Sequence, residues 1–199
     1  MRCGRGLSAE TGVAQDSVQW AVLGAHPDTP SEVVAGLTVE ARLAAPAVLV
    51  CDYALHADTS RVRMPVSHGG ERSDELWRHT CFEAFVSAPG APGYYEFNFS
   101  PAGDWAAYHF DDYRQGRSPV YLVQAPRVHV QLRPARLQVF ATVELAGLPD
   151  LDPARHFRLA LAAVVEDEAG ALSYWSLQHP PGKPDFHHPD AFALELYAP

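Results

Sequence analysis

The sequence predicts an all-β fold with little helix, an antiparallel β-sandwich of the jelly-roll or immunoglobulin-like type. About ten short runs alternate apolar and polar residues, as half-buried strands do, and turn residues separate them. No segment carries the apolar stripe of an amphipathic helix. With 199 residues and 47% hydrophobic content, the chain can bury a full core in one domain.

The first half of the chain contains four of the expected strands. Residues 1–16 are expected to form a flexible leader, and residues 17–199 a single domain whose ordered part opens near Trp20. The strands are expected at residues 37–43, 48–57, 80–87 and 94–100. Pro46 separates the first two, and a polar, glycine-bearing loop at residues 67–73 precedes the third.

The second half supplies the remaining strands. Trp105 follows Gly-Asp at a strand start and is expected to be structural. Further strands are expected at residues 120–123, 128–133, 136–145, 157–166, 172–177 and around Phe192, Leu194 and Leu196. Pro134 with Ala135 indicates a tight hairpin, and the proline-rich segment 178–190 is expected to lack regular structure.

Charge and cysteine usage exclude several classes of function. The formal net charge of -9 weighs against nucleic acid and anionic membranes, which attract clustered Lys and Arg, and favours a neutral or cationic ligand. Cys3, Cys51 and Cys81 lack the spacing of a zinc site or a disulfide framework, so reduced thiols and no cofactor are expected. The chain shows no secretory signal or membrane-spanning stretch, which predicts a cytoplasmic protein; its oligomeric state is left open.

Residues 74–114 concentrate aromatic, carboxylate, amide and histidine side chains between strand-like runs, which indicates a binding face. Alternation along 80–87 puts Phe82, Ala84 and Val86 on one face, and Cys81, Glu83 and Phe85 on the other. In the same way, 94–100 separates Tyr95, Phe97 and Phe99 from Tyr94, Glu96 and Asn98.

A short loop rich in proline and glycine joins these two runs, so they are expected to pair antiparallel. Glu83 would then lie near Glu96 and Asn98 across the sheet. Two interpretations follow: the carboxylates bind a ligand, or they face water and pair with arginines.

Three blocks of the sequence carry a family resemblance: LWRHTCFEAFV, YYEFNFSPAGDWAAYHFDDYR and YWSLQHPPGKPDFHHPDAFALEL. Together they resemble bacterial DOMON-like domains, which are related to family 9 carbohydrate-binding modules, and the similarity runs from Trp20 to Leu196. The resemblance implies a β-sandwich and a non-catalytic binding function. Trp77 and Glu83 match that family's Trp and Glu strand motif, with Thr80 where an aspartate is usual, and Trp175 is the candidate for a second stacking tryptophan.

The residue types support a saccharide as ligand. A sugar ring stacks its C–H groups on an aromatic face, while its hydroxyls need carboxylates and amides. The candidate ligand-binding residues are therefore Trp77, Glu83, Glu96, Asn98, Trp175 and Lys183, the last from a loop that is able to cover the face. Core packing is the alternative role for both tryptophans.

The sequence also offers residues for a metal ion or a haem group. The 178–190 loop offers His179, Asp185, His187, His188 and Asp190, but their spacing fits no standard metal site. Some family 9 modules hold calcium, and the resemblance makes Asp104, Asp111 and Asp112 available for such an ion. Other DOMON relatives hold haem through a Met and a His, which here requires Met64 with His68, His79 or His109.

Two further functions stay open. Glu83 and Glu96 are an acid and base pair for a glycoside-cleaving enzyme if they lie about 5–10 Å apart across a cleft. Alternatively, the exposed aromatic residues form a protein contact or dimer seam.

Overall fold

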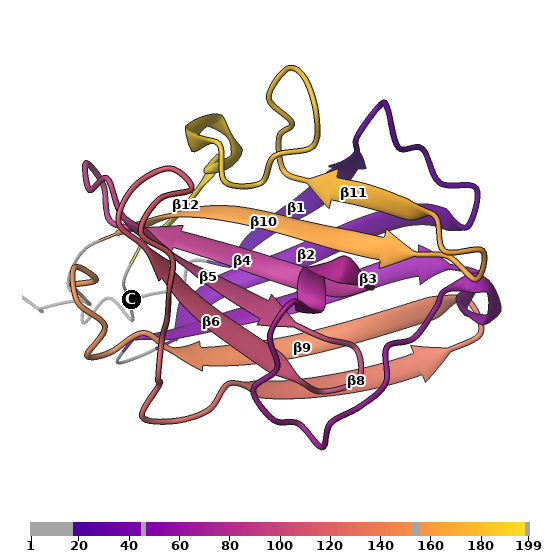
Figure 1. Ribbon diagram of the computed structural model, residues 1–199, viewed down its shortest axis with the longest axis horizontal. Helices are drawn as coiled ribbons and strands as arrows, with labels where there is room; N and C mark the ends of the chain where they lie inside the picture. Colours follow the sequence, from indigo (N-terminus) through magenta and orange to yellow (C-terminus); the bar gives the residue numbers. More distant parts are fainter. Residues whose placement is uncertain (1–17, 45–46, 153–155, 198–199) are drawn as a thin grey trace, which may run out of the picture.

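The computed structural model describes residues 18–44, 47–152 and 156–197. The expected leader at 1–16, including Cys3, lies outside the described residues. Every pair of neighbouring strands in the described chain is antiparallel, and the strands form one sheet of 12 (Figure 1). Their order is β7-β6-β5-β4-β10-β11-β1-β2-β3-β9-β8, with β12 paired to β10.

The sheet has two halves, which we call the first and second half-sheets. The first consists of β1 (Gln19–Ala25), β2 (Val34–Ala44), β3 (Val48–Ala57), β8 (Arg127–Arg133) and β9 (Arg136–Glu144). The second consists of β4 (Cys81–Ser87), β5 (Tyr94–Phe99), β6 (Trp105–Phe110), β7 (Ser118–Pro119), β10 (Phe157–Glu166), β11 (Leu172–Ser176) and β12 (Leu194–Leu196).

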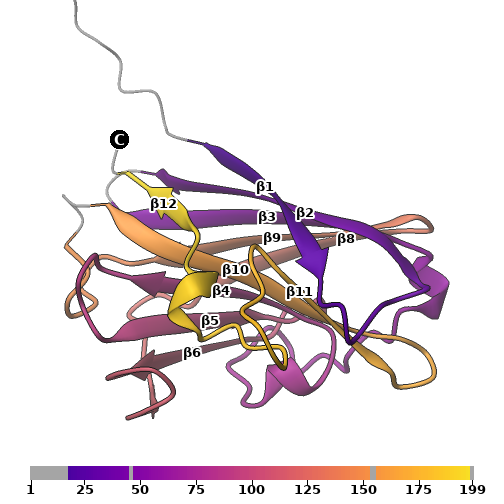
Figure 2. The same cartoon turned by 90° about the horizontal axis from the view of Figure 1, so that it is seen from above.

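The two half-sheets are continuous at one place and face each other elsewhere. β1 pairs with β11 through only two positions, Gly24 with Ser176 and Ala25 with Trp175. From there the sheet curls back on itself, and the halves appear as two layers from above (Figure 2). Their inner faces enclose the main hydrophobic core, in which the rings of Tyr53 and Phe82 lie 5.2 Å apart across the layers.

The predicted antiparallel all-β class is confirmed. Helix is limited, within the described residues, to three 3-10 turns: η1 (Thr59–Arg61), η2 (Leu76–Arg78) and η3 (Pro189–Ala191). None of the described helices has the length and apolar character needed to cross a bilayer. Because β1 and β11 pair, the halves are parts of one curled sheet; a jelly-roll or immunoglobulin-like topology stays a prediction.

Most expected strands are present, but the strand expected at 120–123 is wrong. Ser118 and Pro119 pair with β6, and the Val120 backbone N–H donates to the Ala107 carbonyl of β6 at 2.9 Å, but residues 120–123 are not a strand and lead on to β8 of the first half-sheet. Val120 and Leu122 pack against the core while Tyr121 and Val123 are exposed. This alternation of burial produces a strand-like pattern in a connecting segment. The structure adds β1 around Trp20 and shows that Trp105 begins β6 in the core, as expected.

The central strands of the second half-sheet, β4, β5, β6 and β10, are buried on both faces, and this positions the candidate site. Its inner face contributes Phe82, Phe97 and Phe99 to the main core. Its outer face carries a second hydrophobic cluster that includes Cys81, Phe85, Tyr94, Tyr108, Ala160, Ala162, Phe186 and Phe192. Residues from η2 and from the segment between β11 and β12 cover this outer face. The two faces predicted for residues 80–87 and 94–100 are confirmed.

Candidate functional site

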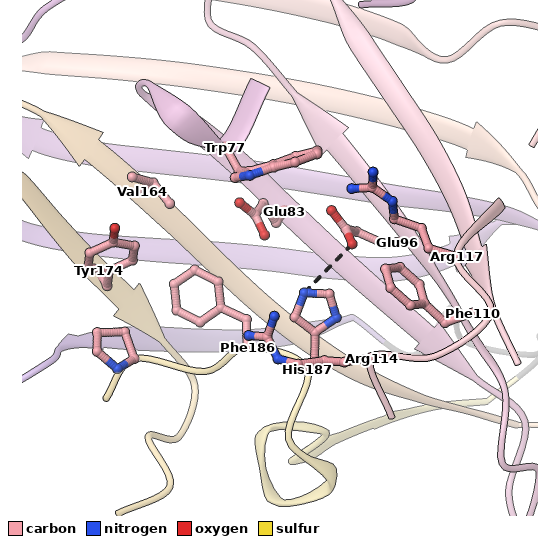
Figure 3. Close-up of a pocket in the computed structure, with 11 residues that line it drawn as sticks. Trp77, Glu83, Glu96, Phe110, Arg114, Arg117, Val164, Tyr174, Phe186 and His187 are labelled. Carbon is pink, nitrogen blue, oxygen red and sulfur yellow. Dashed lines mark ion pairs between the residues drawn. The ribbon is translucent and has the colours of Figure 1, made fainter. Parts of the chain in front are cut away.

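A cavity of about 400 Å³ opens on the outer face of the second half-sheet, beneath η2 and the segment after β11. We call it the Trp77 cavity (Figure 3). It is lined by Trp77, Glu83, Glu96, Phe110, Arg114, Arg117, Val164, Tyr174, Pro184, Phe186 and His187. Aromatic walls thus surround a floor that carries two carboxyl groups.

Strand register brings the two carboxyl groups together. Glu83 on β4 pairs with Asn98 on β5, and Glu96 lies two residues before Asn98 on the same face. The carboxylates are therefore diagonal neighbours, as the alternating pattern predicted. On the other side of β4, Glu83 pairs with Ala162 of β10, so its neighbour on that strand has only a methyl side chain.

Glu83 is buried, and one of its oxygens lacks a partner. The residue is 3% exposed, and Oε1 has no hydrogen-bond partner among the described residues. Burial, and next the charge of Glu96, raises the pKa of the Glu83 carboxyl well above its usual range. The interpretation that Glu83 faces water and pairs with an arginine is wrong. A buried acceptor without a partner costs about 1–3 kcal/mol, which a ligand donor would recover.

Glu96 is also buried but better satisfied. It is 4% exposed, and its Oε1 accepts a hydrogen bond of 2.6 Å from Asn98 Nδ2. Burial raises the pKa of the Glu96 carboxyl to about 7, although the Asn98 hydrogen bond and the nearby arginines oppose this increase. The neighbouring carboxyls therefore retain proton affinity near neutral pH, since two adjacent negative charges in a buried site repel.

Trp77 forms the wall opposite the loop residues. It lies in η2, where the chain turns before entering β4, and its ring packs edge-on against Tyr108 with 5.8 Å between centroids. The Arg117 guanidinium lies 5.5 Å from the Trp77 ring centroid and 5.2 Å from that of Tyr108. The indole is half-buried, so it retains a surface for a ligand.

The second arginine of the cavity is held by a carboxylate. Arg114 donates from Nε and Nη2 to Asp185 Oδ1, at 3.2 and 2.7 Å, and Tyr113 Oη donates to Asp185 Oδ2. These bonds connect the loop after β6 to the segment after β11. They outweigh the effect of burial and lower the pKa of Asp185, so this carboxylate stays ionised and paired.

His187 separates this ion pair from Glu96. Its Nδ1 lies 2.8 Å from the Tyr94 hydroxyl, which itself accepts the backbone N–H of Arg114. That arrangement has Tyr94 donating to Nδ1, which leaves the ring proton on Nε2, 3.9 Å from Glu96 Oε2. Burial, assisted by the Arg114 charge, lowers the pKa of His187 to about 4. The imidazole is therefore neutral at physiological pH.

The structure brings together only some of the predicted ligand-binding residues. Trp77, Glu83 and Glu96 line the cavity, while Asn98 is fully buried beneath it and orients Glu96. Trp175 does not line the cavity: it points from β11 into the main core, is 7% exposed, and donates from Nε1 to Ser173 Oγ at 3.0 Å. Because side chains alternate along β11, its neighbour Tyr174 faces the cavity instead.

Lys183 lies outside the Trp77 cavity. It lines an adjacent depression that shares Arg114 and Pro184 with the cavity. The 178–190 loop does lie over the outer face of the second half-sheet, but Pro184, Phe186 and His187, rather than Lys183, line the cavity. No periodic signal marks these loop residues or Arg114 and Arg117, although all lie within or beside the segments that carry the family resemblance.

The residues considered for a metal site form no cluster among the described residues, whereas three of those considered for haem share a groove. The described residues contain no cluster of three or more His, Cys, Asp or Glu side chains with the geometry of a metal site. Asp104 is fully buried and accepts backbone N–H groups of His68, Gly70 and Glu71. Met64, His68 and His79 line one groove next to η2, whereas His109 lines a different pocket.

The fold is shared with solved structures of carbohydrate-binding proteins. No protein-family model matches the chain, and no curated protein matches its sequence. A candidate carbohydrate-binding protein from Bacteroides uniformis ATCC 8492 superposes with a TM-score of 0.66 and 18% identity, over 90% of this chain and 85% of that one.

A family 9 carbohydrate-binding module from Caldicellulosiruptor kristjanssonii in complex with cellotriose gives a TM-score of 0.55 and 11% identity. That match covers 91% of this chain and 82% of the module. A family 9 module from the same organism in complex with glucose gives a TM-score of 0.52 and 10% identity, over 92% of this chain and 84% of that one. At these identities the likeness shows the fold.

Proposed function

We propose that this protein is a non-catalytic module that binds a saccharide in the Trp77 cavity. One observation carries the proposal: the half-buried indole of Trp77 lines the same cavity as the buried Oε1 of Glu83, which has no hydrogen-bond partner among the described residues. A sugar ring is able to place its C–H face on the indole while a hydroxyl donates to Glu83.

The size and lining of the cavity support this assignment. About 400 Å³ falls within the range of small-molecule sites, roughly 300–1,000 Å³. Tyr174 and Phe186 add apolar contact area, and the guanidinium groups of Arg114 and Arg117 offer donors to hydroxyl oxygens. The saccharide complexes of proteins with a similar fold give independent support for the ligand class.

A thermal-shift screen against mono- and oligosaccharides tests the proposal. A sugar at a hundred times its dissociation constant is expected to stabilise the fold by about 2.7 kcal/mol, a shift of several degrees. Trp77→Ala should abolish the shift. Trp20→Ala is the matched control, because Trp20 is 64% exposed on β1 of the first half-sheet. A shift that survives Trp77→Ala, or no shift with any sugar, would contradict the proposal.

The buried carboxyl pair also permits a test of the enzymatic alternative. A glycoside hydrolase needs two carboxyl groups on either side of the scissile bond, whereas Glu83 and Glu96 lie on adjacent strands of one cavity floor. We expect no release of product from a panel of aryl glycosides at pH 5–8. Turnover that disappears in Glu83→Gln would replace the binding function with an enzymatic one.

Haem binding is the second candidate, because Met64 shares a groove with His68 and His79. Both histidines bond through Nδ1 to buried carboxylates, His68 to Asp104 and His79 to Glu166, which leaves Nε2 available as a ligand atom. The saccharide proposal predicts no Soret absorption after incubation with haemin. A Soret band that Met64→Leu removes would favour the haem function.

A further inference from the structure

We propose that the Trp77 cavity selects amino sugars, with the ligand's ammonium group held between Glu83 and Glu96. This inference rests on the proposed function and specifies its ligand class. The carrying observation is a juxtaposition: two buried carboxyl groups on neighbouring strands share one aromatic-walled cavity, and Glu83 Oε1 has no partner among the described residues.

The arginines of the cavity are already engaged with other groups. Arg114 makes two hydrogen bonds to Asp185, and Arg117 lies over the rings of Trp77 and Tyr108. Glu83 and Glu96 therefore face each other's charge across the cavity floor, with the arginines acting on them only as neighbouring charges. The arginine charges offset the repulsion between the two carboxylates only in part, and a ligand cation between the carboxylates would add an opposite charge in direct contact with both.

The walls suit an ammonium that is attached to a ring. Trp77 offers a stacking surface to the sugar, and Tyr174 and Phe186 provide further aromatic faces, which attract cations as well as C–H groups. Ala162, opposite Glu83 on β10, leaves that side of the carboxylate unobstructed by a long side chain. A neutral hydroxyl would satisfy one acceptor, whereas an ammonium donates to both carboxylates and neutralises their repulsion.

Proton release from the carboxyl pair should distinguish the binding of an amino sugar from that of a neutral sugar. The titratable and charged groups around Glu83 are Glu96 from β5, Cys81 from β4, Tyr53 from β3, Arg114 and Arg117 from the loop after β6, Tyr174 from β11, and Asp185 and His187 from the following segment. Among them, the pKa of Glu83 is raised well above its usual range, the pKa of Glu96 is raised to about 7, and His187 is neutral at pH 7. An ammonium that enters should therefore displace a proton from the pair, whereas a neutral sugar should not.

The experiment is titration calorimetry with two matched series: glucose, glucosamine and N-acetylglucosamine, and the corresponding galactose compounds. Acetylation removes the charge and keeps the ring. At pH 6.5 we expect one amino sugar to bind on the order of tenfold or more tightly than its parent and its N-acetyl derivative. Repeating the titration in buffers of different ionisation enthalpy should reveal proton release for that sugar alone.

Variants then identify the site. Glu83→Gln and Glu96→Gln keep side-chain shape and should each reduce the preference for the amino sugar to near parity, with neutral-sugar binding retained. Glu144→Gln, at an exposed position on β9, is the control and should behave as the unmodified protein. Thermal melts establish that each variant is folded before titration.

The possible results separate the two proposals. Equal binding of neutral and amino sugars would support the saccharide function and overturn the amino-sugar preference. A preference that persists in both Gln variants would overturn it as well. If none of the sugars binds, including the neutral ones, the saccharide function itself fails.

Discussion

The hydroxyl of Tyr53 on β3 donates a hydrogen bond of 2.8 Å to the backbone carbonyl of Glu83 on β4. Both residues are buried, and this bond crosses the core from the first half-sheet to the strand that carries the central carboxylate of the cavity. The position of Glu83 thus depends on packing between the half-sheets as well as on its own strand pairing.

Removal of that hydroxyl should destabilise the protein and loosen the site. Tyr53→Phe leaves the Glu83 carbonyl without this donor in the core, so we expect a loss of about 1–2 kcal/mol in the free energy of unfolding. Urea denaturation measures it. Tyr121→Phe, at a residue 83% exposed, should be neutral. An equally neutral Tyr53→Phe would show that the inter-sheet hydrogen bond does not contribute.

Glu96 should make the protein less stable as pH rises. Its pKa of about 7 exceeds the ordinary 4.5, so the folded state holds a proton that the unfolded state releases between these values. Stability from this group is fully present below about 4.5 and is lost as pH rises to about 7, by roughly 1–3 kcal/mol. Glu96→Gln should therefore be more stable than the unmodified protein at pH 8, with a smaller difference at pH 5. Melting temperatures of the two proteins across pH 4.5–8 make the comparison. A constant difference between them over this range would contradict the prediction.

His187 should act in the opposite direction on the acid side. Its pKa of about 4 lies below the ordinary 6.5, so unfolding takes up a proton between these values and stability falls as pH decreases through that window. The neutral imidazole also accepts the Tyr94 hydroxyl. We expect His187→Gln to lose less stability than the unmodified protein between pH 6.5 and 4. Chemical denaturation at the two pH values, with His56→Gln as an exposed control, makes the comparison.

Trp175 and Trp20 differ in burial, so their replacement should affect stability differently. Trp175 is 7% exposed in the main core, so Trp175→Ala should cost about 3–5 kcal/mol. Trp20 is 64% exposed, and Trp20→Ala should change stability by about 0.5 kcal/mol or less. Trp175→Phe, which retains most of the apolar volume, should bind sugar as the unmodified protein does. Loss of sugar binding in a folded Trp175→Phe protein would show that Trp175 contributes to the binding site.

Asp104 should be a strong contributor to the loop that precedes the site. Its carboxylate accepts from the backbone N–H groups of His68 and Gly70 at 2.8 and 2.9 Å, and from His68 Nδ1 at 3.0 Å. Burial alone would raise the pKa of Asp104, but these bonds lower it overall. Its contribution is therefore present above the ordinary value of 3.8 and is lost as pH falls below the depressed folded value. Asp104→Ala should cost roughly 2–4 kcal/mol at pH 7 by urea denaturation.

The alternation of apolar and polar residues along each strand was enough to predict which side chains share a face of the sheet. Period two separated Phe82 from Glu83 and Phe97 from Glu96, and the short Pro and Gly loop between the runs predicted their antiparallel pairing. The proximity of the two carboxylates followed from those facts. Covalent geometry fixes which side chains share a face, so this information is local and can be taken from one segment at a time.

Tertiary structure decided which face of each strand meets which layer. Trp175 is the larger aromatic residue, but the pairing of β11 with β10 and β1 directs it into the main core and Tyr174 into the cavity. Tertiary structure also decided the state of residues 120–123. Their burial alternates as in a strand, but they form the connection between the half-sheets. Arg114, Phe186 and His187 reach the cavity from loops, where no period constrains a side chain. The sequence alone therefore determined most of the strands and the carboxyl pair, while the walls, the burial and the resulting proton affinity of the cavity arise from contacts between distant segments.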